Sequence, residues 1–199
     1  MRQGSSARGR RYLRRCSLAV TAAVVAGLIG GSDRASAAAD MPSQQEVEAV
    51  YLFDFGKFVR WPAPGTQGSM RICVAAAPSF STSMEKTVSG EQIDGRSLEV
   101  RHVSRPDEAD ACAILFIDAT QRANEQELLQ AVEGKPTLTV SDAPGFLERG
   151  GMVQFQMVHS RVRFAVNLTA VNHASLSMSS ELLKVAIRVQ GSASAGGAQ

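Results

Sequence analysis

Short apolar runs of strand length constrain the fold of this chain more than any other feature. They are MRICVAA at residues 70–76, ACAILFI at 111–117 and PTLTVS at 136–141. Such runs, apolar at nearly every position, are typical of strands buried on both faces. Helix-compatible segments at 80–90 and 121–133 lie between the runs. This alternation predicts a single α/β domain with a mainly parallel central sheet flanked by helices.

The later part of the chain has a different pattern. Residues 153–157 and 161–166 each alternate apolar and polar side chains, which predicts an antiparallel hairpin with one solvent-exposed face. Ser179 or Ser180 then caps a final helix that runs to Val189. We therefore expect the domain to end in an antiparallel hairpin and a C-terminal helix.

Residues 1–37 have the order of an export signal. Six arginines precede an uncharged stretch from Cys16 to Ser32, and the small residues Ala35-Ser36-Ala37 follow it. That order predicts a cleaved secretory signal peptide. An uncleaved anchor is the alternative, although a membrane span needs roughly 20 apolar residues.

The rest of the chain divides into three parts. Residues 38–45 are a short lead-in, residues 46–190 form the α/β domain, and residues 191–199 are a disordered tail of small residues. Cleavage would remove seven Arg and one Asp from totals of 21 basic and 19 acidic residues, which leaves a net charge of −4. Because no Lys/Arg cluster remains to neutralise a row of phosphates, the sequence argues against nucleic-acid binding.

Two cysteines, Cys73 and Cys112, remain after the predicted cleavage. An even pair in an exported chain favours one disulfide, and two buried free thiols are the alternative. The bridge would close a loop of about 40 residues and stabilise the fold by roughly 4 kcal/mol in the chain-entropy model.

The sequence predicts no catalytic site, no metal site and no cofactor. His102, His159 and His173 are isolated from one another, and no Cys-x-x-Cys or G-x-S-x-G motif occurs. Asp142 follows a predicted strand, where Asp is most often a turn former. We therefore expect a protein that is not an enzyme. A triad assembled from distant residues is the alternative, because triads are recognised by geometry rather than by order.

Arg60 and Trp61 are the most unusual local feature, because Arg and Trp are the residues that anchor protein interfaces. A tryptophan that closes the first helix within the core is the alternative. That helix, predicted over residues 46–60, is apolar on nearly all sides and includes Phe55. It is either a core layer or a partner-binding surface.

A small-molecule-binding module is the second interpretation. Arg60 and Trp61 would then lie beside Ser177 and Ser179 and line a pocket for an anionic or aromatic metabolite.

Taken in order and spacing, several segments resemble the YfiR/HmsC family of periplasmic regulators. They are VYLFDFGKFVRWP, RICVAA, CAILFI, PTLTVSD with a following GF, GGMVQF, RVRFAVNLTAV and LSMSSELLKVA. Ala113 departs mildly from the pattern, because a polar residue typically follows the cysteine there. Some relatives have a second cysteine pair near Phe146 and Gly151, and this chain has none there. The resemblance therefore carries over only the bridge between Cys73 and Cys112.

The resemblance implies a regulator in the periplasm. Members of this family bind the sensory domain of an inner-membrane diguanylate cyclase and hold the cyclase inactive, which lowers cyclic di-GMP and biofilm formation. An OmpA/Pal-like outer-membrane lipoprotein can sequester the repressor and release the cyclase. Family members also tend to form homodimers.

Overall fold

The computed structural model describes residues 41–62 and 68–191, so the predicted signal peptide and the predicted tail beyond Gly191 lie outside the described residues. The helices are α1 (Gln44–Phe58), α2 (Pro78–Val88), α3 (Glu125–Ala131), α4 (Leu168–His173) and α5 (Ser180–Val185), with 3-10 turns η1 (Pro106–Ala109), η2 (Ala119–Gln121) and η3 (Leu147–Arg149). The strands are β1 (Val59–Arg60), β2 (Met70–Ala75), β3 (Gln92–Ile93), β4 (Arg96–His102), β5 (Ile114–Ile117), β6 (Leu138–Ser141), β7 (Val153–Val158), β8 (Arg161–Asn167), β9 (Ser177–Met178) and β10 (Arg188–Gln190).

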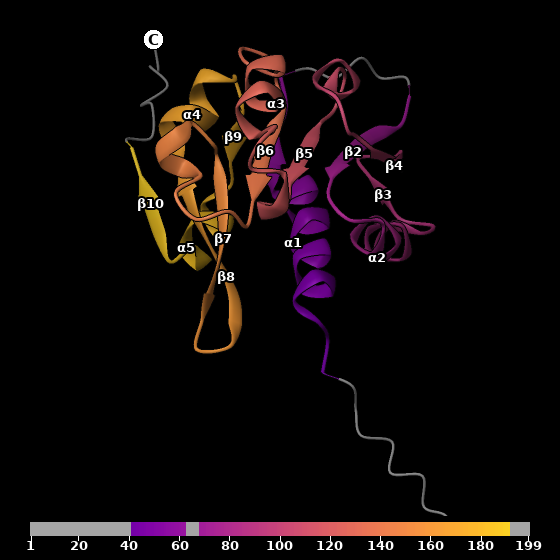
Figure 1. The fold of residues 1–199 in the computed structure, drawn as a ribbon, viewed down its shortest axis with the longest axis horizontal. Helices are drawn as coiled ribbons and strands as arrows, with labels where there is room; N and C mark the ends of the chain where they lie inside the picture. The colour runs from indigo at the N-terminus through magenta and orange to yellow at the C-terminus, as the bar shows by residue number, and fades with distance from the viewer. Residues whose placement is uncertain (1–40, 63–67, 192–199) are drawn as a thin grey trace, which may run out of the picture. The chain divides into compact units, whose positions relative to one another are not determined.

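Eight of these strands form one mixed sheet in the order β10-β8-β7-β6-β5-β2-β4-β3 (Figure 1). Strands β4, β2, β5, β6 and β7 run parallel to one another, while β7 and β8 form an antiparallel hairpin. The apolar runs that predicted buried strands are β2, β5 and β6 in the middle of this sheet. The prediction of a mainly parallel α/β sheet is confirmed.

The sheet has a hydrophobic core on each face. Side chains of β5 alternate between the two, with Ile114 and Phe116 in one core and Leu115 and Ile117 in the other. The first core also contains side chains of α1 and α2, and the second contains Leu128 of α3. Within residues 41–62 and 68–191, no helix has the length and apolar character that a bilayer span requires.

Helix α1 belongs largely to the first core. Ser43 and Glu46 form a capping box at its start, which satisfies free backbone N–H groups. Phe55 is fully buried, with its ring centroid 5.1 Å from that of Phe164 and 5.9 Å from that of Phe155 on the hairpin. The helix ends two residues earlier than predicted, because Val59–Arg60 pairs with β9 instead.

Two expectations for the C-terminal part need correction. The hairpin does not present one fully wet face, because Gln154 is buried and its side chain accepts a hydrogen bond from the Phe146 backbone N–H at 3.1 Å. The final helix ends at Val185 instead of Val189. Residues Arg188–Gln190 form strand β10, which pairs with the free side of β8. The helical periodicity of this segment did not indicate that residues 188–190 would pair with the backbone of β8.

The structure contains the disulfide between Cys73 and Cys112, and both residues are buried in the second core. The bond joins β2 to the segment that leads into β5. The two cysteines lie 39 residues apart in the sequence, so the bond closes a long loop.

Replacing both cysteines by serine (Cys73→Ser with Cys112→Ser) should lower the free energy of unfolding by about 4 kcal/mol, because the unfolded chain gains the entropy of the opened loop. Urea denaturation followed by circular dichroism measures this loss. A reductant should destabilise the natural chain and leave the double variant unchanged. Equal urea midpoints for the oxidised natural chain and the variant would show that the bridge contributes no stability.

Candidate functional site

Arg60 and Ser177 meet in the small two-stranded sheet formed by β1 and β9. The strands are antiparallel, with Val59 opposite Met178 and Arg60 opposite Ser177. Arg60 and Ser177 are both exposed, and the preceding Phe58 is also 40% exposed. We call Phe58, Arg60 and Ser177 the β1–β9 patch.

Two other predicted site residues have structural roles. The Ser179 hydroxyl accepts a hydrogen bond from the Leu182 backbone N–H at 3.2 Å and so caps α5. The Ser179 backbone N–H donates to the Phe58 carbonyl oxygen at 2.9 Å. Phe55 is buried in the aromatic cluster between α1 and the hairpin, so the structure assigns it to the core rather than to a partner-binding surface.

Trp61, which directly follows Arg60, lines a hollow that shares no residue with the β1–β9 patch. Its side chain is partly buried, and the indole N–H donates to the Ala113 carbonyl oxygen at 3.2 Å. The hollow has a volume of about 370 Å³, and neither Arg60, Ser177 nor Ser179 lines it. The structure therefore does not gather the four residues of the predicted pocket around one cavity.

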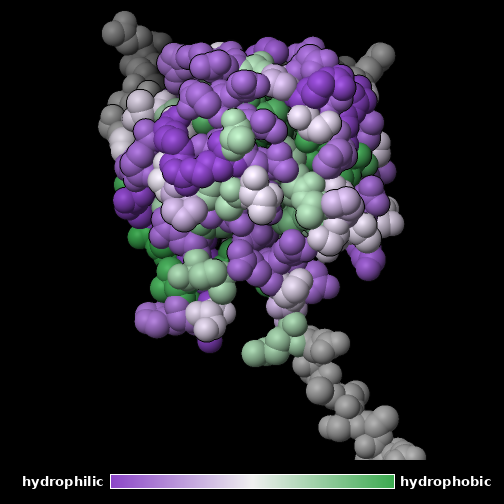
Figure 2. All heavy atoms as spheres, viewed as in Figure 1, coloured by the Kyte–Doolittle hydropathy of each residue, from purple (hydrophilic) through white to green (hydrophobic). Residues whose placement is uncertain are grey.

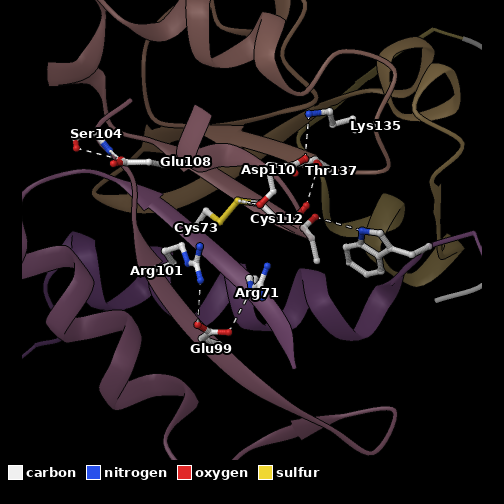
Figure 3. The surroundings of a disulfide bond; sticks show 12 residues. Arg71, Cys73, Glu99, Arg101, Ser104, Glu108, Asp110, Cys112, Lys135 and Thr137 are labelled. Atoms are coloured by element: carbon white, nitrogen blue, oxygen red, sulfur yellow. Dashed lines mark hydrogen bonds and ion pairs between the residues drawn. A yellow bond between two sulfur atoms is a disulfide. The ribbon is translucent and has the colours of Figure 1, made fainter. Parts of the chain in front are cut away.

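Basic side chains of this hollow come from the starts of three parallel strands. Arg71 lies in β2, Arg96 begins β4, and Lys135 precedes β6. Figure 3 shows Arg71 directed at Glu99 and Lys135 directed at Asp110 around the disulfide. Our reading of the sequence missed this group. The sequence could have predicted it, because these cations lie at or just before the starts of parallel strands, and such starts meet at one edge of a sheet.

Carboxylates collect at the opposite edge of the sheet. Asp118 follows β5 and Asp142 follows β6, where the Asp142 carboxylate accepts a hydrogen bond from the Ala119 backbone N–H at 2.7 Å. Glu48 of α1 is only 2% exposed and accepts a hydrogen bond from the Gln44 side-chain amide at 2.8 Å. Burial raises the pKa of Glu48 to about 7, and the charges of Asp142 and Asp118 contribute in the same direction. Burial also raises the pKa of Asp142.

The three histidines lie on separate elements. His102 ends β4, His159 is in the turn between β7 and β8, and His173 ends α4, which Figure 1 places in different regions of the domain. Among the described residues, no group of three or more His, Cys, Asp or Glu side chains is placed to hold a metal ion.

These features define a mixed α/β domain. Its candidate site residues are the cations, aromatic rings and hydroxyl groups of the β1–β9 patch and of the hollow beside Trp61, which are side chains suited to binding. The same fold occurs in a crystal structure of a conserved domain protein from Vibrio cholerae O1 biovar El Tor, with a TM-score of 0.52 and 12% identity over 74% of this chain. It also occurs in an ABC domain in complex with L-Trp from Streptococcus pneumoniae, with a TM-score of 0.51 and 12% identity over 73% of this chain. The matches span 60% of each of those two chains.

Residues 45–187 match the family described as YfiR/HmsC-like, DUF4154, and the chain belongs to that family. The resemblance found in the sequence is therefore confirmed. The family is a regulatory rather than a catalytic one. A comparison with curated proteins gives no match.

The buried Glu48 carboxyl should make the stability of the domain depend on pH. Below pH 4.5 Glu48 is protonated in both the folded and the unfolded chain. As the pH rises from 4.5 to about 7, the unfolded chain ionises first, so stability is lost over this range. At roughly 1.4 kcal/mol per pKa unit, the loss is about 3 kcal/mol. Replacing Glu48→Gln should restore this amount above pH 7 and change little at pH 4.5, as measured by urea unfolding across this pH range.

Glu85→Gln on the exposed side of α2 is the matched control, and we expect it to keep the pH dependence of the natural chain. If Glu48→Gln keeps that dependence as well, the assignment of the pH effect to Glu48 is wrong.

Proposed function

We propose that this chain is an exported periplasmic regulator that binds the sensory domain of an inner-membrane diguanylate cyclase and holds the cyclase inactive. The match of residues 45–187 to the YfiR/HmsC-like family is the observation that carries this proposal. Lower cyclic di-GMP and less biofilm would follow. An OmpA/Pal-like outer-membrane lipoprotein that competes for the regulator would release the cyclase.

The mechanism we propose is a shift of population. A regulator that binds the inactive cyclase more tightly than the active cyclase favours the inactive state by that difference in binding free energy. A difference of about 5.5 kcal/mol is needed to move the cyclase from almost fully active to almost fully inactive. The sensory-domain interface must therefore include a few strongly contributing side chains.

The β1–β9 patch is the surface that we propose for the cyclase. Phe58 and Arg60 combine an exposed aromatic ring with an exposed guanidinium, and aromatic and Arg side chains commonly dominate binding energy in interfaces. Arg60 makes no ion pair with any described residue, so its charge is free to meet a carboxylate of a partner.

Reversing the charge at this patch should weaken binding. We expect Arg60→Glu to raise the Kd for the purified sensory domain of a cyclase encoded in the same genome at least tenfold, which is about 1.4 kcal/mol. Isothermal titration calorimetry measures the Kd. Arg161→Glu, at the exposed tip of the hairpin, is the matched control and should bind normally. Normal binding by Arg60→Glu would exclude the patch, and no binding by the natural chain to any encoded sensory domain would contradict the proposed function.

Edge strand β10 is the surface that we propose for a homodimer. Val185 at the end of α5, Ile187 before β10 and Val189 in β10 are 59%, 45% and 39% exposed, and β10 is the last strand at its end of the sheet. An edge strand presents unpaired backbone groups, and two copies of one edge can pair with each other about a two-fold axis. Hydrophilic residues cover much of the face shown in Figure 2, and exposed apolar groups gathered along one segment are typical of a protein interface.

Placing charges on this edge should separate the dimer. We expect the natural chain without its signal to elute as a dimer, and the double variant Ile187→Lys with Val189→Lys to elute as a monomer, in size-exclusion chromatography with light scattering. Met157→Lys, which changes an exposed apolar side chain on the hairpin, should stay dimeric. A double variant that remains dimeric would rule out the β10 edge as the interface.

A further inference from the structure

The hollow beside Trp61 gathers positive charge from separate parts of the chain. Arg71, Arg96 and Lys135 line its wall, and Asp110 is the one carboxylate among the described lining residues. The three cations are brought together because β2, β4 and β6 all run in the same direction in the sheet. Its volume of about 370 Å³ lies within the range of small-molecule sites.

Arg96 is the cation of this group without a partner. Arg71 pairs with Glu99 at 3.2 Å and Lys135 pairs with Asp110 at 3.2 Å, whereas Arg96 makes no ion pair with a described residue. The Arg96 Nε is buried and has no hydrogen-bond partner within residues 41–62 and 68–191. The Arg96 side chain as a whole is partly exposed and lines the hollow, so an anion bound there can pair with a guanidinium that no described carboxylate neutralises.

Arg71 and Lys135 remain available to bind an anion although each is in an ion pair. The Arg71 and Lys135 pairs lie partly in solvent, with Asp110 76% exposed, and exposed pairs of this kind contribute little stability. Both cations can therefore turn toward an anion in the hollow at small cost. A guanidinium matches the two oxygens of a carboxylate, which favours a carboxylate as the anionic group.

Apart from Ser69 and Thr137, the remaining side chains that line the hollow are apolar. Trp61, Pro62, Met70 and Ala113 line it, and the hydrogen bond from the Trp61 indole N–H to the Ala113 carbonyl oxygen holds the ring in place. A fixed indole ring offers a flat apolar partner for stacking. A ligand for this hollow therefore needs a flat apolar part beside its charge.

We propose that this hollow is a binding site for a small organic acid, with its carboxylate held by Arg96, Arg71 and Lys135 and its flat apolar group against Trp61. The site is separate from the β1–β9 patch and does not depend on the proposed binding to a cyclase.

Trp61 is the single tryptophan of the chain, so its fluorescence reports directly on this hollow. The test titrates the chain without its signal with benzoate, a flat carboxylate, and follows indole emission with correction for absorption by the ligand. Benzyl alcohol supplies a similar ring without the charge, and inorganic phosphate supplies the charge without the ring. We expect a saturable change with benzoate and at least a tenfold weaker effect with each of the other two compounds.

Arg96→Gln should weaken benzoate binding at least tenfold, and Lys135→Gln should weaken it severalfold. Arg161→Gln, at the exposed tip of the hairpin and outside the hollow, is the matched control and should bind benzoate normally. Circular dichroism checks that each variant is folded, and Lys135→Gln keeps the test informative if Arg96→Gln does not fold. Absence of saturable benzoate binding, equal binding of benzyl alcohol or of phosphate, or normal binding by the folded cation variants would overturn the proposal.

Discussion

Strands β5 and β6 are buried along their whole length, and β2 is buried at all but one position, so both faces of the sheet must be covered. One core is built with α1 and α2, and a second core is built with α3 and the segment around Phe146. The disulfide lies within the second core, where Cys73 and Cys112 are both buried. The positions of the helices thus follow from the need to bury these strands.

The common direction of these strands also sorts the charged residues. Arg71, Arg96 and Lys135 lie at the edge where the parallel strands begin, and Asp118 and Asp142 lie at the edge where they end. Charged side chains are disfavoured in the middle of a sheet that is covered on both faces, so they gather where its strands begin and end. The hollow beside Trp61 takes its cations from the first of these ends, and Asp118 and Asp142 at the second end help to raise the pKa of Glu48.

The surfaces that we propose for partners lie at the margins of this core. The β1–β9 patch is held by backbone pairing between distant segments, and β10 extends the sheet beside β8. Both are anchored to rigid elements, which keeps exposed side chains such as Arg60 and Ile187 in a defined position for binding. An α/β domain of the YfiR/HmsC-like family can in this way present several contact surfaces from one stable scaffold.

The sequence alone determined the α/β class, the central strands, the one cysteine pair of the domain and the family, because each follows from local patterns or from their order along the chain. Only the tertiary structure decided that Phe55 is core, that Gln154 is buried and that residues 188–190 form a strand. It also decided that Arg60 pairs with Ser177 in a small sheet, while Trp61 lines one hollow together with Arg96 and Lys135. These outcomes depend on contacts between segments far apart in the chain, and the periodicity of a single segment carries no information about which distant segment will cover it.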